Sequence, residues 1–64
     1  MLTMKQARIG ADLTQAAVAD EMGVHPTTYL RFEKHPENMT IKQAMLFANI
    51  VGVHFDDIIF CQKL

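Results

Sequence analysis

Three histidines and a single cysteine are the residues of the sequence that first suggest a metal site or a nucleophilic pair. Zinc sites draw paired ligands about two to four residues apart, and no pair in this set has that spacing. A cysteine–histidine nucleophile would also need an oxyanion hole and a cleft, which nothing in this short chain supplies. We therefore expect no metal, no cofactor and no enzymatic activity. The four residues are His25, His35, His54 and Cys61.

A different chemistry is open to the basic residues in the middle of the chain. Arg31 follows Thr27 by four residues, so both would lie on one face of a helix. A guanidinium in the major groove can donate two hydrogen bonds to the O6 and N7 of a guanine. Lys34 would instead bind phosphate, with little preference among bases. The alternative is that Arg31 is an ordinary solvated surface charge.

The overall charge of the chain does not by itself indicate nucleic acid. Six Lys and Arg stand against seven Asp and Glu, which gives a net charge of −1. Only the segment 25–42 leans positive, with three basic and two acidic side chains. Because a strongly basic composition is missing, a DNA-binding hypothesis has to rest on motif.

Composition also indicates the cellular compartment in which the protein is expected. A single cysteine cannot form an internal disulfide, which fits a reducing cytoplasm. The N-terminus lacks a basic region followed by an apolar one, so we expect no secretory signal. The longest apolar run, residues 44–48, is far shorter than the ~20 residues that a membrane span needs. We expect one cytoplasmic domain over residues 1–64, without membrane contact.

Caps and apolar spacing divide the chain into short helices and indicate no strand. Thr3 and Gln6 form a capping box at the start of the first helix, and Thr40 with Gln43 repeats it at the fourth. A last short helix is expected to begin near Phe55, where acidic residues favour a helix N-terminus. The predicted fold is all-α, a compact bundle of five helices.

The second and third helices have the form of a helix-turn-helix. The second is expected from Gln15 to about Met22, where Gly23 ends it by adopting a positive φ. Pro26 suits the first position of the third helix, because its missing N–H has no partner there. The motif covers residues 15–34, and its second helix is shaped to enter a major groove.

The motif and its surroundings resemble the phage repressor and Cro-type helix-turn-helix family, the xenobiotic-response-element-like DNA-binding domains. The resemblance implies the lambda-repressor-like fold, double-stranded DNA as the partner, and a transcriptional regulator such as a phage or prophage repressor. It extends without gaps from about residue 5 to residue 60. The matching segments are Leu13-Thr14-Gln15, Val18-Ala19-Asp20-Glu21-Met22-Gly23-Val24, Phe32-Glu33, Ala48, Gly52-Val53 and Phe55-Asp56-Asp57-Ile58-Ile59.

The same resemblance implies a role for individual residues. The third helix, about residues 26–34, would lie in the major groove, with phosphate contacts from Gln15 and Thr28. Arg8 and Glu33 match a pair that forms a partly buried ion pair in this family, so Arg8 is not expected to bind DNA. For His25, capping the helix or simple exposure stays an alternative to base contact. The implied base readers are His25, Pro26, Thr27 and Arg31, and Lys34 joins the phosphate contacts.

Two departures from the family pattern support a second hypothesis. The loop 35–39 usually carries basic residues, but here it contains Pro36 and Glu37, and Leu30 stands at an exposed position that is usually polar. Fewer neutralised phosphates mean weaker DNA affinity and a shallower salt dependence. The alternative function is a protein-interaction module on the same fold that modulates a repressor.

The C-terminal end suggests how the chain assembles. Ile58, Ile59, Phe60 and Leu64 are more apolar than a terminal turn needs. They predict a homodimer, weak or formed on DNA, because an operator is usually read by two recognition helices. The alternative is that these side chains close the core of the monomer.

Overall fold

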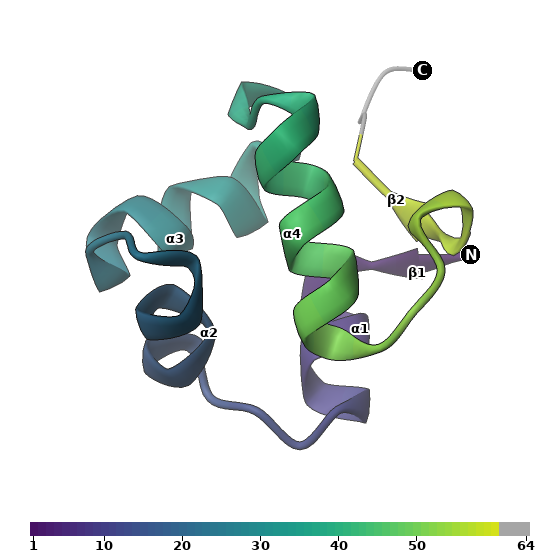
Figure 1. The fold of residues 1–64 in the computed structure, drawn as a ribbon, viewed down its shortest axis with the longest axis horizontal. Coiled ribbons are helices and arrows are strands. Elements are labelled where there is room, and N and C mark those ends of the chain that lie inside the picture. Colours follow the sequence, from purple (N-terminus) through teal and green to yellow (C-terminus); the bar gives the residue numbers. More distant parts are fainter. Residues whose placement is uncertain (61–64) are drawn as a thin grey trace.

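Four α-helices, two single-turn 3₁₀ helices and two short strands make up residues 1–60, the part of the chain that the computed structural model describes (Figure 1). The helices form the body of the molecule, and the strands lie beside the N-terminus. The elements are β1 (Leu2–Thr3), α1 (Met4–Gly10), α2 (Gln15–Met22), α3 (Pro26–Lys34), η1 (Pro36–Asn38), α4 (Ile41–Val51), η2 (Phe55–Asp57) and β2 (Ile58–Ile59).

The helix boundaries follow from local hydrogen bonds. At α1 the Thr3 hydroxyl accepts from the Gln6 amide at 3.1 Å, and the Gln6 side chain accepts from the Thr3 amide at 2.9 Å. Thr40 and Gln43 make the same pair of bonds at α4, so both predicted capping boxes are confirmed. Each box satisfies two backbone donors that the first turn of a helix leaves without partners.

Positive φ angles end two of the helices. Gly23 and Gly52 follow α2 and α4 with φ of 73° and 70°. Asp12, after α1, has a φ of 60°, which Asp tolerates better than most residues with a side chain. All three turns are tight, and the one at Gly23 sets the path from α2 into α3.

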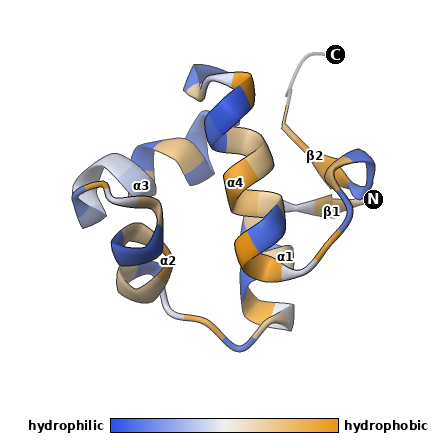
Figure 2. Ribbon diagram, viewed as in Figure 1, coloured by the Kyte–Doolittle hydropathy of each residue, from blue (hydrophilic) through white to orange (hydrophobic). Residues whose placement is uncertain are grey.

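The core surrounds α4, whose ribbon has much of its length in the colour of hydrophobic residues in Figure 2. The Phe47 ring is stacked on the Tyr29 ring at 6.2 Å between centroids and meets the Phe60 ring edge-on at the same distance. Burial of such rings is the main stabilising term in a domain this small. The buried apolar residues are Met4, Ala7, Val18, Ala19, Tyr29, Phe32, Met39, Ala44, Phe47, Ala48, Val51 and Ile58.

The prediction of a fifth helix is wrong. Residues 1–60 contain four α-helices, and the segment near Phe55 forms only the single 3₁₀ turn η2. Asp56 and Asp57 do lie in its first turn, as predicted. The helix goes no further because the next two residues are extended and pair with the N-terminus, so the acidic residues begin a turn and not a helix.

The expectation of no strand is also wrong. β1 and β2 pair in parallel, with Leu2 opposite Ile58 and Thr3 opposite Ile59. Strands of two residues carry no alternating pattern, and this pair joins opposite ends of the chain, so its signal is tertiary rather than local. Within residues 1–60 no helix is long and apolar enough to span a bilayer.

The positive φ at Gly52 leads to a stability prediction. A Cβ at Gly52 would meet no atom within 4 Å, so the effect of Gly52→Ala comes from the backbone alone. We expect a loss of about 1–2 kcal/mol in the free energy of unfolding. Gly10→Ala is the matched control, since Gly10 is helical and equally open, and it should stabilise by about 0.5–1 kcal/mol. Urea unfolding measures both; equal effects of the two variants would contradict the conformational explanation.

Candidate nucleic-acid interface

Helix α3 has one buried and one exposed side. Tyr29 and Phe32 are buried in the core, which fixes the rotation of the helix about its axis. Thr27 and Arg31 are exposed and one helical turn apart, so they share the outward face. The structure therefore brings these two predicted base readers together on one surface. Leu30, 40% exposed, is also accessible on α3.

The start of α3 is held by His25, whose Nδ1 accepts a hydrogen bond from the Thr27 amide at 3.1 Å. The capping alternative for His25 is thus present, and Pro26 occupies the first turn as predicted. Because Nδ1 is an acceptor here, a neutral His25 carries its proton on Nε2. The exposed imidazole therefore offers Nε2–H as a donor at the helix start, so capping and an outward contact do not exclude each other.

The turn between α2 and α3 keeps the two helices close. The Val24 amide donates to the Ala19 carbonyl at 3.0 Å, and Gly23 adopts the left-handed conformation that this reversal needs. Ala19 is fully buried at the crossing, where its small side chain allows the backbones to approach. This arrangement sets the angle of α3 relative to α2.

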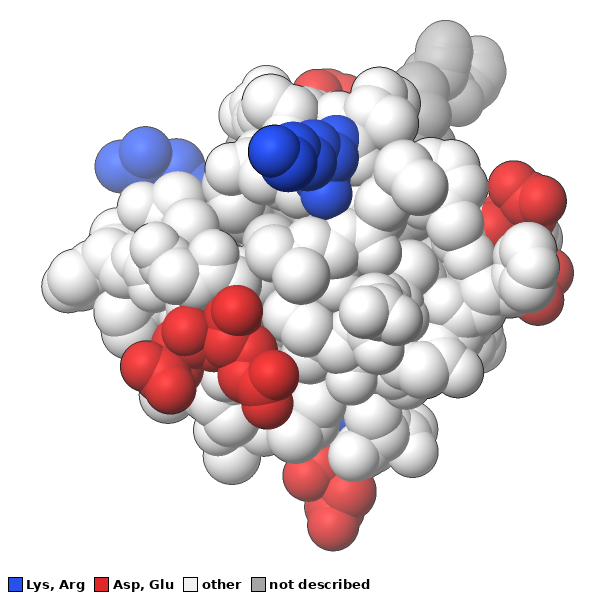
Figure 3. All heavy atoms as spheres, in the orientation of Figure 1, with Lys and Arg blue, Asp and Glu red and all other residues white. Residues whose placement is uncertain are grey.

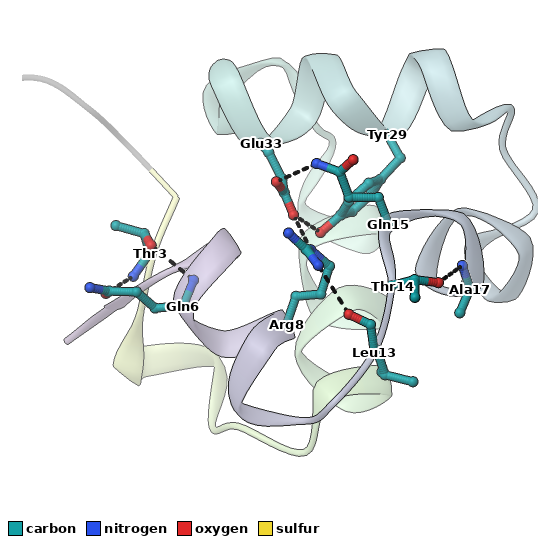
Figure 4. A network of polar contacts seen from close by, with 9 residues as sticks. All are labelled: Thr3, Gln6, Arg8, Leu13, Thr14, Gln15, Ala17, Tyr29 and Glu33. Atoms are coloured by element: carbon teal, nitrogen blue, oxygen red, sulfur yellow. Dashed lines mark hydrogen bonds and ion pairs between the residues drawn. The ribbon is translucent and has the colours of Figure 1, made fainter.

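A carboxylate at the end of α3 joins three helices (Figure 4). Glu33 Oε2 accepts from Arg8 Nε of α1 and from the Tyr29 hydroxyl, each at 2.6 Å. Glu33 Oε1 accepts from Gln15 Nε2 of α2 at 3.1 Å. Arg8 also donates through Nη1 to the Leu13 carbonyl at 3.0 Å, so it reaches the linker before α2. These five residues are called the Glu33 network below.

The ion pair in this network is shielded from water. The side chains of Arg8 and Glu33 are only 10% and 8% exposed. No buried side-chain nitrogen or oxygen within residues 1–60 is left without a hydrogen-bond partner. The network is therefore satisfied, as a charged group removed from water must be.

The network shifts two ionisation equilibria. Burial alone would raise the pKa of Glu33, but hydrogen bonds from Arg8, Tyr29 and Gln15 outweigh it and hold the pKa below its usual range. Burial raises the pKa of the Tyr29 hydroxyl, and the neighbouring Glu33 carboxylate raises it further. At neutral pH the network thus contains an ionised Glu33 that accepts from a neutral Tyr29.

The remaining predicted site residues lie around this framework. Gln15 and Thr28 are half-buried, whereas Lys34 is exposed near the end of α3. Gln15 begins α2, so its side chain is at the same helix end as the Thr14 cap, which accepts from the Ala17 amide. One N–H of the Gln15 carboxamide is used by Glu33, and the second is available to another acceptor.

Sequence reasoning missed the polar part that Tyr29 plays. The three-residue spacing of Tyr29 and Phe32 predicts that both face the core, which their burial confirms, but it says nothing of the Tyr29 hydroxyl. Tyr29 and Glu33 are four residues apart on a helix, a spacing that brings side chains into contact, and this signal could have found the bond. The Leu13 carbonyl could not have been found, because backbone acceptors leave no mark in a sequence.

A family model described as helix-turn-helix matches residues 4–58, which is most of the chain. The chain belongs to the Cro/C1-type helix-turn-helix family. Searches of the curated proteins and of the solved structures gave no significant match.

Membership in the Cro/C1-type family assigns the chain to a class of DNA-binding transcription regulators, whose domains are typically not enzymes. Within residues 1–60 no three His, Cys, Asp or Glu side chains gather as they would around a metal ion. Cys61, one of the residues considered for metal or nucleophilic chemistry, lies outside the described part.

Removal of Arg8 should destabilise the fold strongly. Arg8→Ala leaves the shielded Glu33 carboxylate without its cation, and loss of one partner of such a pair costs about 3–5 kcal/mol. Lys5→Ala, at an exposed position of α1, should change stability by less than about 0.5 kcal/mol. Chemical unfolding followed by circular dichroism compares the two variants; an Arg8→Ala protein as stable as Lys5→Ala would rule out this role.

The lowered pKa of Glu33 predicts a pH dependence of stability. The pKa of Glu33 is lower in the folded than in the unfolded chain. Ionised Glu33 therefore stabilises the fold at pH values above its ordinary pKa of 4.5. This contribution is lost as the pH falls from there through the folded-state pKa. In Glu33→Gln we expect lower stability than wild type at neutral pH, and the difference in the free energy of unfolding should narrow as the pH falls below 4.5.

The measurement is the free energy of unfolding as a function of pH for the wild type, for Glu33→Gln and for a control variant. Glu21→Gln, at an exposed position of α2, is the control and should follow the wild-type curve. A gap between Glu33→Gln and wild type that is constant with pH would contradict the assignment.

Proposed function

We propose that this protein is a sequence-specific regulator of transcription that reads DNA with α3 in the major groove. The observation that carries the proposal is the two-sided character of α3. Buried Tyr29 and Phe32 fix the helix, while Thr27 and Arg31 on its other side remain exposed. A helix held in this way can present the same side chains to every base pair that it meets, which sequence recognition requires.

The proposed roles divide between bases and phosphates. Arg31 donates two hydrogen bonds to a guanine, and Thr27 contacts the adjacent base pair. His25 offers its Nε2–H at the start of α3, next to Pro26, which supplies apolar contact. Thr28 and Lys34 bind phosphates on the two sides of the groove. This division follows the general pattern in which phosphate contacts position a protein and base contacts specify the sequence.

Gln15 links the DNA backbone to the Glu33 network in this proposal. One N–H of the Gln15 carboxamide donates to Glu33. The other N–H donates to a phosphate at the N-terminus of α2. The network thereby orients the phosphate contact as well as α3. Arg8, which is buried in the ion pair, has no direct contact with DNA.

The operator is proposed to be a two-fold site that binds two copies, in the manner of a phage or prophage repressor. A single α3 reads only one half-site, and half-sites lie ~34 Å apart along DNA. The dimer contact was expected at Ile58, Ile59 and Phe60. In the structure Ile58 is buried and Phe60 packs against the rings of Phe47 and Phe55, so most of this apolar surface closes the monomer. Leu64 lies outside the described residues.

The second candidate function is a protein-interaction module that modulates a repressor. The observation that favours it is the exposure of Leu30 on α3, together with Glu37 in a loop that would face phosphate. The side chain of Glu37 lies 3.4 Å from His35 Nδ1, and both are exposed. Failure of the protein to select any DNA sequence would favour this function over the first.

Substitution of Arg31 tests the DNA-reading proposal. Arg31→Ala should fold normally, because the side chain is exposed, and should flatten the preference at one base pair by about 1–3 kcal/mol. Lys34→Ala should weaken binding to all sequences alike and reduce the salt slope by about one. The measurement is a binding series over single-base variants of a duplex that the wild type selects from a random pool.

Lys5→Ala is the control for loss of one positive charge away from α3. It should leave both the base preference and the salt slope unchanged. If Arg31→Ala kept the base preference of the wild type at every position of the duplex, the proposed contact between Arg31 and a guanine would be refuted.

A further inference from the structure

A stripe of four side chains runs along the exposed side of α3. Its members are three, four and seven positions apart, so they lie on one face of the helix, away from buried Tyr29 and Phe32. All four are exposed. A ligand that lies along this face meets all of them together. The stripe consists of Thr27, Leu30, Arg31 and Lys34.

Leu30 is the apolar member of this stripe. It is 40% exposed, and α3, which the structure describes in full, exposes no other large hydrophobic side chain. Within residues 1–60 the other exposed large hydrophobic side chains lie on α1, on α4 and at the N-terminus. Surfaces that bind proteins are usually contiguous apolar patches. An isolated leucine instead fits a ligand that offers one small apolar group.

The charges beside Leu30 favour a polyanion as that ligand. Arg31 and Lys34 lie on the same stripe, and the third charged residue of α3, Glu33, is paired with Arg8 and has a side chain only 8% exposed. Figure 3 shows Lys or Arg atoms at the upper left, above α3, and Asp or Glu atoms at the lower left, over α2. The exposed charges of α3 are therefore positive, as a surface that approaches phosphates requires.

We propose that Leu30 contacts the 5-methyl group of a thymine in the major groove. This methyl is the one apolar group among the donors and acceptors that base pairs present there, and apolar side chains contact it. The inference rests on the proposed function, since it needs α3 in the groove. It adds a thymine to the guanine that Arg31 reads, and thereby names a second base of the operator.

Helix geometry places this thymine close to that guanine. Leu30 and Arg31 are consecutive, so they differ by about 1.5 Å along the helix axis and about 100° around it, which puts their Cβ atoms about 5 Å apart. Stacked bases are about 3.4 Å apart. The thymine should therefore lie one or two base pairs from the guanine.

Replacement of thymine by deoxyuridine removes only this methyl group and so tests the contact. Each thymine of the duplex that the wild type selects from a random pool is replaced in turn, and affinity is measured by fluorescence anisotropy. We expect one replacement, one or two base pairs from the guanine read by Arg31, to weaken wild-type binding about fourfold, as loss of one buried methyl group does. Leu30→Ala should bind the thymine and deoxyuridine duplexes equally well.

Two variants serve as matched controls. Ile9→Ala also shortens an exposed aliphatic side chain, but on α1, and it should keep the fourfold dependence on the methyl group. Thr27→Ser removes the other methyl group of the stripe while it keeps the hydroxyl, and it should keep the dependence as well. Circular dichroism establishes that the variants are folded, and the wild-type series needs no variant.

Three results would overturn the inference: a wild type that no deoxyuridine near the guanine weakens, a methyl dependence that survives in Leu30→Ala, or one that is lost in Thr27→Ser. The first is expected if Leu30 contacts another protein and not DNA. If any of these occurs while Arg31→Ala still flattens the preference for guanine, this inference alone fails. A wild type that selects no duplex would overturn both this inference and the DNA-reading proposal.

Discussion

The carboxylate of Glu33 is the interaction on which the rest of this structure depends. It accepts from Arg8 of α1, Gln15 of α2 and Tyr29 of its own helix, so one small group fixes three of the four helices relative to one another. A carboxylate so far removed from water is stable only with all of these donors, because burial of an uncompensated charge is costly. The arrangement is sensitive to substitution, since loss of any one donor leaves the buried Glu33 carboxylate without a hydrogen bond that offsets its removal from water.

The orientation of α3 follows from this constraint together with the core. Tyr29 belongs to both, because its ring is stacked on Phe47 while its hydroxyl donates to Glu33. The outward face with Thr27 and Arg31 is therefore held from behind by apolar packing and at the end of the helix by an ion pair. In a chain with a net charge of −1, placement of the few cations matters more than their number.

The sequence was informative wherever structure is set locally. The capping boxes at Thr3 and Thr40 and the turn at Gly23 depend on neighbouring residues, and all were predictable. The strands, the single turn at η2 and the Gln15–Glu33 bond depend on which distant segments meet, and no local pattern encodes that. The sequence likewise predicts an exposed apolar surface at the C-terminal end, whereas the structure buries Ile58; the large apolar side chains that it exposes lie on several elements, Ile41, Met45 and Leu46 of α4 among them.

The most direct test of the central claim is to locate DNA on the folded protein by NMR. The isotope-labelled chain would be titrated with the duplex that it selects from a random pool, and amide shifts would be followed by residue. We predict the largest shifts at residues 15–17 and 25–31, where α2 begins and where the outward face of α3 lies. A titration in which none of these amides shifts, or a pool from which no duplex is selected, would contradict the account.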